Sequence, residues 1–281
     1  MSHFPDNLRL PQIRQGGLSF SRLGLGTVKF GRNTGVKYPD AFALPDLKTL
    51  SHLLAYAQSL GVNLLDTAPA YGESESRLGQ LLQGQREAWV LVGKAGERFE
   101  QGVSQFDFSR KAVIESVEQS LKRLKTDYLD LLLIHSDGQD LKIFKENEIS
   151  VTVQDLKASG KIRLGGMSTK TVEGGLLAIE YLDAVMCCYR PGYEDERPVL
   201  ERAHQRNKIA LLKKVLDSGH QVAAVKMQKG PVNDPIAHAM TFAFNHPGVS
   251  SVIVGTLDPE HLRHDAACVQ EALSSISAKH P

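Results

Sequence analysis

Four side chains that can hold or transfer protons stand at or just after the ends of three apolar runs. Asp66 ends the run VNLLD, and Tyr71 follows it in the loop DTAPAYG. Lys94 ends the run WVLVGK, and His135 ends the run LDLLLIH. Taken singly, an Asp after a strand is usually a turn residue, and a Tyr, Lys or His there is more often structural or at the surface. Because successive runs deliver a carboxylate, a phenol, an ammonium and an imidazole, the pattern favours one shared site.

These four groups match the needs of hydride transfer to a carbonyl. Hydride arriving at the carbonyl carbon leaves negative charge on the oxygen, so the site needs a proton donor and a second hydrogen-bond donor. Tyr71 can supply the proton, and a neighbouring ammonium such as Lys94 eases its release. Asp66 would hold Lys94 charged and in place, and His135 would orient the substrate oxygen. We therefore predict an oxidoreductase that moves hydride from a nicotinamide cofactor to the carbonyl of an aldehyde or ketone, with Tyr71 as the general acid.

The segments that must position these groups alternate between two patterns. Short runs rich in Val, Ile and Leu recur with segments of helical period between them, which is typical of βα units around a parallel sheet. The length of 281 residues is close to the roughly 250 of a (β/α)8 barrel, whose active site lies at the carboxyl ends of the strands. We predict an α/β fold, a (β/α)8 TIM barrel, with strands at Leu23–Gly26, Val62–Asp66, Trp89–Gly93, Leu129–Ile134, Arg163–Gly166, Ala184–Cys188, Ile209–Lys213 and Ser251–Val254.

Three helices are indicated by apolar stripes and capping residues. The stripe within 50–60 is followed by Gly61, which favours a helix end there. Ser109 is a suitable N-cap for a second stripe within 113–124. The pair Asp258–Pro259 predicts the start of a last helix.

Two further segments lie outside the strand and helix pattern. Residues 8–20 contain a Gly-Gly pair between apolar ends, which predicts a β-hairpin that plugs the barrel. The segment 220–235 is either a strand in its own right or the lead into a helix over 235–245. No internal repeat or linker is visible, so we predict a single barrel domain over residues 1–281.

The composition is that of a globular protein that acts on a small molecule. With 42% hydrophobic residues, 23% charged residues and a net charge of +1, the chain has no basic block that would predict a nucleic-acid or membrane partner. Cys187, Cys188 and Cys268 form no CxxC pair, and the histidines show no metal-ligand spacing, so we predict neither disulfide nor metal. No apolar run has membrane-spanning length, and we expect a cytoplasmic protein. The oligomeric state is left open.

At three places the sequence resembles the aldo-keto reductase superfamily. The segments are GVNLLDTAPAYGESESRLGQLL, VGKAG and SLKRLKTDYLDLLLIHSDG, and they occur in the family's order. The resemblance implies that Tyr71 is the general acid, that Lys94 and Asp66 support it, and that His135 is the orienting donor. It also implies NADP(H) as the cofactor, bound without a Rossmann fold, with NAD(H) as the alternative.

The resemblance also implicates residues in cofactor binding. The segment GKIRLGGMST is similar to the family's fifth strand, and LGLGTVKFG to its first-strand turn; SVIVGTLDPEHLRHD is similar to the late segment around the pyrophosphate and adenosine. The cofactor contacts implied are Gly26, Thr27, Asp66, Ser168, Thr169, Gly255, Thr256 and Asp265.

The chain departs from the family pattern at the cofactor site. Met186 stands where many members have a Gln that binds the carboxamide, and a thioether is a poor acceptor and no donor. Thr169 stands where Asn is common. Gly255 and His261 stand where many members hold the adenosine 2′-phosphate with Lys and Arg, although Arg263 could compensate.

Two other functions fit parts of the same pattern. One is a barrel enzyme in which Lys94 or Lys213, each at a strand end, forms a Schiff base with a carbonyl substrate. The other is a non-catalytic, reductase-like subunit that binds the cofactor and a protein partner. In the loop after the first strand, Phe30, Arg32 and Tyr38 either line the substrate opening or face solvent.

Overall fold

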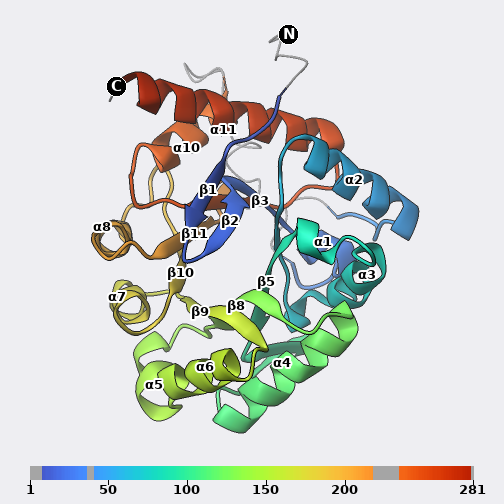
Figure 1. Ribbon diagram of the computed structural model, residues 1–281, viewed down its shortest axis with the longest axis vertical. Helices are drawn as coiled ribbons and strands as arrows, with labels where there is room; N and C mark the ends of the chain where they lie inside the picture. The colour runs from blue at the N-terminus through green and yellow to red at the C-terminus, as the bar shows by residue number, and fades with distance from the viewer. Residues whose placement is uncertain (1–7, 37–40, 218–233, 280–281) are drawn as a thin grey trace.

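The centre of the molecule is a closed barrel of eight parallel strands surrounded by helices (Figure 1). The structure is a computed structural model, and it describes residues 8–36, 41–217 and 234–279. The strands of the barrel, in chain order, are β3 (Leu23–Gly26), β4 (Leu64–Asp66), β5 (Val90–Ala95), β8 (Leu129–His135), β9 (Ile162–Ser168), β10 (Ala184–Cys188), β11 (Ile209–Lys213) and β12 (Ser251–Val254). The predicted (β/α)8 barrel is therefore confirmed.

Some strand limits differ from the sequence prediction. Four strands have the predicted bounds, whereas β5 and β9 run two residues further at their carboxyl ends. The pairing explains the extension, because Lys94 of β5 pairs with Leu133, and Ser168 of β9 pairs with His135. Polar residues at the barrel rim are thus part of the hydrogen-bonded sheet, which an apolar run does not reveal.

The helices form the outer layer of the barrel (Figure 1). The Asp46 side chain accepts from the Thr49 N–H at the start of α2, and Gly61, at φ +80°, follows its end. Ser109 caps the start of α4 as predicted. The helices are α1 (Val28–Gly31), α2 (Leu47–Ser59), η1 (Pro69–Tyr71), α3 (Ser74–Leu81), η2 (Arg86–Ala88), α4 (Arg110–Leu124), α5 (Asp140–Glu146), α6 (Ile149–Ala158), α7 (Val172–Tyr181), α8 (Arg197–Gln205), α10 (Pro235–Phe244) and α11 (Pro259–Lys279).

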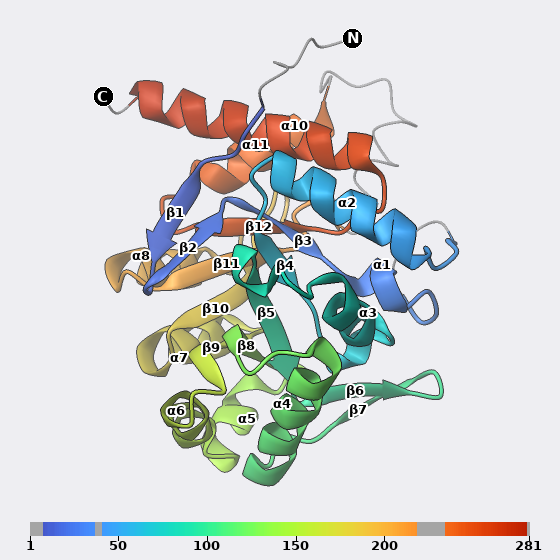
Figure 2. The same ribbon diagram turned by 45° about the vertical axis from the view of Figure 1, so that its right-hand side comes forward.

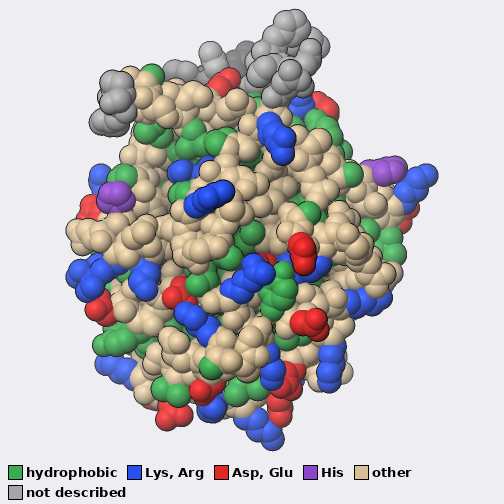
Figure 3. Space-filling model, viewed as in Figure 1, with side chains coloured by type: hydrophobic (Ala, Val, Ile, Leu, Met, Phe, Trp, Pro, Cys, Tyr) green, Lys and Arg blue, Asp and Glu red, His purple; other side chains and the backbone are tan. Residues whose placement is uncertain are grey.

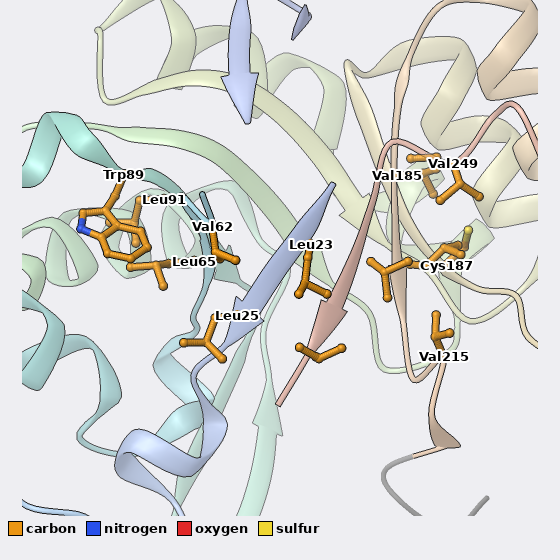
Figure 4. Packing of buried hydrophobic residues seen from close by; sticks show 14 of the residues in the cluster. Leu23, Leu25, Val62, Leu65, Trp89, Leu91, Val185, Cys187, Val215 and Val249 are labelled. Carbon is orange, nitrogen blue, oxygen red and sulfur yellow. The ribbon is translucent and has the colours of Figure 1, made fainter. Parts of the chain in front are cut away.

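Alternate residues of the barrel strands belong to two apolar clusters. One cluster contains helix residues and the strand residues Leu65 and Leu91, so it fills the space between barrel and helices. Figure 4 shows part of this cluster around the strands. The other contains Leu64, Val92 and further residues of the strands and the N-terminal hairpin only, so it fills the barrel interior. This alternation decides which rim residues point inward.

The N-terminal hairpin closes the amino-terminal end of the barrel. It consists of β1 (Gln12–Gln15) and β2 (Leu18–Ser21), joined by the predicted Gly-Gly turn. Phe20 is 1% exposed and belongs to the interior cluster. The Ser21 N–H donates to the side chain of Asn63, which precedes β4, at 2.8 Å. The hairpin therefore acts as the expected plug.

A second hairpin follows β5, and the sequence pattern did not predict it. It consists of β6 (Glu97–Glu100) and β7 (Val103–Phe106), and Figure 2 shows it projecting from the barrel beyond α4. Its turn residues Gln101 and Gly102 have positive φ angles of 51° and 85°. The strands are short and mostly charged or polar, so they lack the apolar run that marks the barrel strands.

The uncertain sequence segment 220–235 lies largely outside the described residues, which resume at Asp234. The helix expected from Pro235 is confirmed as α10. Within residues 8–36, 41–217 and 234–279, we find no helix with the length and apolar character that a bilayer crossing requires. Positive and negative side chains are interspersed on the face shown in Figure 3.

The plug should contribute strongly to stability. We expect Phe20→Ala to lower the free energy of unfolding by about 3–5 kcal/mol, because it leaves a cavity at the barrel floor. The matched control Ser19→Ala changes an exposed side chain of the same strand and should change stability by less than about 0.5 kcal/mol. Urea unfolding followed by circular dichroism measures both, and equal losses would contradict a plugging role for Phe20.

Candidate active site

Alternate side chains of each barrel strand point inward, and the titratable rim residues belong to this inward set. In β4, Leu64 points into the barrel, so Asp66 two residues later does so too. In β5, Val92 and Lys94 share the inward face, and in β8, Leu133 and His135 share it. All of these polar residues lie at the carboxyl ends of adjacent strands.

Lys94 is the centre of a buried polar cluster. Its side chain is 1% exposed, and its Nζ forms an ion pair with Asp66 Oδ1. The same Nζ donates to Tyr71 OH at 3.0 Å and to the Thr67 carbonyl at 3.3 Å. Tyr71 OH also lies 3.5 Å from Asp66 Oδ2. The carboxylate, ammonium and phenol predicted from sequence are therefore in direct contact.

The loop that carries Tyr71 is held by buried hydroxyl groups. Ser74 Oγ donates to Thr27 Oγ1 at 2.7 Å and lies 3.1 Å from Thr67 Oγ1. Thr27 Oγ1 in turn donates to the Asp66 carbonyl at 3.0 Å. Close backbone approach is also required at Gly31, because a Cβ there would lie 2.5 Å from the Tyr71 carbonyl. The tyrosine therefore sits on a fixed turn.

His135 faces the phenol from β8, two strands along from β4. The rings of Tyr71 and His135 meet edge to face, with centroids 6.4 Å apart. Burial lowers the pKa of His135, as do the cations Lys94 and Lys213, and together they outweigh the opposing effect of Glu97. The imidazole is therefore mostly neutral at pH 7.

Glu97 is a site residue that the sequence pattern did not single out. Its Oε2 lies 2.8 Å from Nδ1 of His135, the distance of a charge-assisted hydrogen bond, although the oxygen is not in line with the ring N–H. Burial alone would raise the pKa of Glu97, but His135, Ser104 and Arg32 lower it to about 2. The only sequence signal was the alternation in ERFE beside the turn QG.

The hairpin that carries Glu97 is tied to the tyrosine loop. The Arg32 guanidinium lies 3.3 Å from the centroid of the Phe99 ring on the hairpin. The same side chain donates to the Ala70 carbonyl, next to Tyr71, at 3.0 Å. Arg32 thus joins the loop after β3, the loop after β4 and the hairpin after β5.

The rim also brings together polar groups from β9 and β11. Lys213 points inward like Leu211, and its Nζ donates to Ser168 Oγ at 2.9 Å and to the Thr169 carbonyl at 2.7 Å. Thr169 Oγ1 is buried, and no hydrogen-bond partner for it lies in the described part of the chain. The Thr169 N–H donates to the Met186 carbonyl at 3.0 Å, which fixes the backbone here.

The residues implied for the rest of the cofactor lie along β3, β12 and α11. Gly26 pairs with Asp66, and Val254 of β12 pairs with Leu25, so Gly255 continues beside Gly26. Thr256 Oγ1 accepts from the Asp258 N–H at 3.0 Å and helps to start α11.

Asp265 lies on α11 and is 3% exposed. Burial and the charge of Asp234 raise its pKa to about 8. It is therefore mostly protonated at pH 7 and can donate as well as accept a hydrogen bond.

Other candidates lie away from this centre. Phe30 is fully buried in the outer cluster. Both alternatives from the sequence, lining the substrate opening or facing solvent, are therefore wrong for this residue. Tyr38 lies outside the described residues. Cys187 is buried in the same outer cluster, in keeping with a packing role.

Among the described residues, one group of side chains has the mutual distances of metal ligands. Asp234 Oδ2 lies 2.9 Å from His264 Nε2 and 3.9 Å from Cys268 Sγ. The other Asp234 oxygen accepts from the backbone at the start of α10. The sequence pattern did not reveal this group, because Asp234 lies 30 residues before His264 and 34 before Cys268.

Comparison with known proteins identifies the family. A family model described as the aldo/keto reductase family matches residues 22–182, which include Asp66, Tyr71, Lys94 and His135. The chain belongs to this family. Its members are oxidoreductases that use NAD(P)H on carbonyl compounds.

Similar proteins include members of this family from several bacteria. The protein called aldo-keto reductase YhdN of Bacillus subtilis (strain 168) is 33% identical over 165 residues, which are 57% of this chain and 47% of that protein. An NADH-specific methylglyoxal reductase of Escherichia coli (strain K12) is 28% identical over 209 residues, or 69% of this chain and 60% of that protein. The chain spans about half the length of the first curated relatives it matches.

A solved structure is similar over nearly the whole chain. PA4992 of Pseudomonas aeruginosa, which carries the same family assignment, is 46% identical, with a TM-score of 0.84. The match covers 95% of this chain and 98% of that chain. The barrel described above is therefore the fold of this aldo/keto reductase family member.

The buried ion pair should be strongly coupled. We expect Lys94→Met to lower the free energy of unfolding by about 3–5 kcal/mol, because it leaves the Asp66 carboxylate buried without its cation. Adding Asp66→Asn should recover part of this loss, so that the double variant loses less stability than the two single variants lose together. Breaking the pair Arg110–Asp155, whose side chains are 44% and 48% exposed, should cost less than about 1 kcal/mol. Strict additivity at Asp66 and Lys94 in chemical unfolding would contradict the coupling.

Proposed function

We propose that this protein is an NAD(P)(H)-dependent oxidoreductase that reduces aldehydes or ketones to alcohols, with Tyr71 as the general acid. The observation that carries the proposal is the 3.0 Å contact between Lys94 Nζ and Tyr71 OH at the inward rim of the barrel. A phenol held against an ammonium, with an imidazole ring facing it, is suited to proton transfer at a carbonyl oxygen. A non-catalytic scaffold would need none of these contacts.

In this proposal the protein supplies the proton and stabilises charge. Hydride for the carbonyl carbon would come from a nicotinamide cofactor bound at the rim. Tyr71 OH donates its proton to the carbonyl oxygen as negative charge develops there, and the Lys94 ammonium stabilises the phenolate that remains. Asp66 keeps Lys94 charged and directed at the phenol. General-acid catalysis of this kind is typically worth about 10²–10⁴-fold in rate.

The residues of the rim fit a nicotinamide cofactor. The unpartnered, buried Thr169 Oγ1 offers a hydrogen-bonding group that a carboxamide could satisfy. Ser168 lies beside it, held by Lys213. Met186 cannot act as the amide donor common in the family, whereas Lys213 Nζ at the same rim donates to Ser168 Oγ and to the Thr169 carbonyl. We propose Gly26, Thr27 and Asp66 as further contacts at the nicotinamide end.

The adenosine end leaves the choice of cofactor less constrained. We propose Gly255, Thr256 and Asp265 as contacts there, and NADP(H) as the cofactor with NAD(H) as the alternative. Gly255 has no side chain to bind a 2′-phosphate, and His261 is 72% exposed and close to Asp258. One relative, from E. coli, is named as an NADH-specific methylglyoxal reductase, which supports keeping NAD(H) as the alternative.

The substrate that we propose is a small carbonyl or alcohol rather than a macromolecule. The site lies at the rim of one barrel, and the four groups converge within a few side-chain lengths. The three cysteines are free, which fits a reducing compartment such as the cytoplasm.

A lysine Schiff-base enzyme is the second candidate, and Lys213 is the observation in its favour. Burial lowers the pKa of Lys213, which favours the nucleophilic amine. Lys94 is less suited, because it is committed to Asp66 and Tyr71. Borohydride trapping of an aldehyde adduct on Lys213, without any dependence on nicotinamide cofactor, would favour this candidate.

Removal of the phenol oxygen tests the main proposal. We expect Tyr71→Phe to lower the reduction of 4-nitrobenzaldehyde by at least about 10²-fold, because the general acid is lost. Binding of NADPH or NADH, measured by fluorescence titration, should be nearly unchanged. The control Tyr181→Phe alters an exposed tyrosine on α7 and should keep full activity. Equal turnover by wild type and Tyr71→Phe would refute the assigned role.

Removal of the unpartnered hydroxyl tests the cofactor site. We expect Thr169→Val to raise the stability of the cofactor-free protein by about 1 kcal/mol, because a buried polar atom without a partner is removed. The same change should weaken nicotinamide binding several-fold. Thr152 on α6 also has a buried hydroxyl without a partner in the described residues, so Thr152→Val should stabilise without altering cofactor affinity. Unchanged cofactor affinity in Thr169→Val would exclude the carboxamide contact.

A further inference from the structure

The contact between Glu97 and His135 constrains where the imidazole carries its proton. Glu97 is ionised at neutral pH, so its oxygen 2.8 Å from Nδ1 can only accept a hydrogen bond. Although this oxygen lies off the N–H axis, its negative charge at 2.8 Å favours a proton on Nδ1 over a lone pair there. The neutral ring therefore keeps its single proton on Nδ1, which leaves Nε2 bare.

The other ring nitrogen is the one available to a ligand. Nδ1 is shielded from solvent, yet the His135 side chain as a whole is 20% exposed. The exposed part of the ring therefore lies on the side away from Glu97. His135 also shares the inward face of its strand with Leu133, which directs the ring to the rim where Tyr71 lies.

This geometry conflicts with the simplest role for His135. A neutral imidazole with a bare Nε2 cannot donate a hydrogen bond to a carbonyl oxygen, whereas it can accept one from an alcohol. A doubly protonated ring donates from both nitrogens and keeps the Glu97 contact. The function of the ring thus depends on its protonation state.

We propose that Glu97 is a positioning residue that holds a proton on Nδ1 of His135, so that Nε2 binds a carbonyl oxygen only when the ring is doubly protonated and otherwise binds an alcohol. The inference rests on the proposed carbonyl reduction and deepens it. Through Glu97, the hairpin β6–β7 then helps to determine whether Nε2 of His135 binds a carbonyl or an alcohol.

The groups that face the ring set the pH at which it changes. Glu97 approaches from β6 and favours the imidazolium, whereas Lys94 from β5 and Lys213 from β11 oppose it. The Tyr71 phenol faces the ring from η1. Because burial is the largest effect and lowers the pKa of His135, the carbonyl-binding form is present below that lowered pKa and is lost as the pH rises through it.

The hairpin is built to hold Glu97 in this position. Ser104 Oγ on β7 donates to Glu97 Oε1 at 2.6 Å, which leaves Oε2 for His135. Phe99 on β6 packs against the Arg32 guanidinium, and Arg32 also binds the loop of Tyr71. The carboxylate is therefore held from two sides.

Histidine side-chain NMR on the ¹⁵N-labelled protein tests the proposal without substrate or cofactor. Above its pKa, wild-type His135, assigned with His135→Asn, should show its proton on Nδ1. In Glu97→Gln the amide can accept from or donate to Nδ1, so the proton can move to Nε2, and a measurable fraction of that tautomer should appear. A wild-type spectrum with the proton on Nε2 would overturn the proposal, and this result needs no variant to fold.

The pH profile of carbonyl reduction provides the functional arm. Wild-type kcat/KM should fall about tenfold per pH unit above the pKa of His135, because the donor form is lost. Glu97→Gln should lose most of this fall, because its neutral ring can donate from Nε2. Glu100→Gln, an exposed carboxylate at the end of the same strand, should keep the wild-type profile.

The two arms separate the inference from the proposed function. Absence of carbonyl reduction in the wild type would refute the proposed function, while the NMR tautomer would still decide the role of Glu97. A Glu97→Gln profile identical to that of wild type, in an active enzyme, would overturn the inference alone.

Discussion

The buried ion pair between Lys94 and Asp66 is the interaction on which the rest of the site depends. An ammonium that is 1% exposed is tolerated only where a carboxylate and further acceptors surround it. Here the acceptors are Asp66, the Thr67 carbonyl and the Tyr71 phenol, and all three belong to β4 and the turn after it. The contacts that satisfy the charge of Lys94 therefore also orient the Tyr71 phenol. The apolar residues of the strands and of the N-terminal hairpin fill the barrel interior below this ion pair.

Further contacts around this ion pair fix the positions of the polar side chains at the rim. The hydroxyl groups of Thr27, Thr67 and Ser74 fix the turn, and Arg32 ties it to the hairpin after β5. The hairpin in turn brings a carboxylate to His135. Each of these contacts restricts the position of one rim group. The chemistry of the rim thus depends on loops that the barrel positions but does not specify.

The residues proposed to bind the cofactor differ from those common in the family. Met186 has lost the amide that is common in the family, while Lys213 and Thr169 place an ammonium and an unpartnered hydroxyl at the same rim. At the other end, Gly255 removes a cationic side chain, and Asp265 is buried and mostly protonated at neutral pH. The residues proposed for the cofactor thus depart from the family pattern, whereas Asp66, Tyr71, Lys94 and His135 keep it.

The sequence by itself determined the barrel and the meeting of four titratable groups at its rim, because both follow from local patterns. Apolar runs mark buried strands, and residues at their carboxyl ends must meet at one rim of a closed parallel sheet. Only the tertiary structure decided the partners of those groups. Glu97 lies on short charged strands without an apolar signal, and its contact with His135 joins residues thirty-eight positions apart. The burial of Phe30 was equally hidden, since exposure of a loop residue depends on what packs over it. Both features depend on how separate segments pack together, and local residue type and spacing do not reveal that packing.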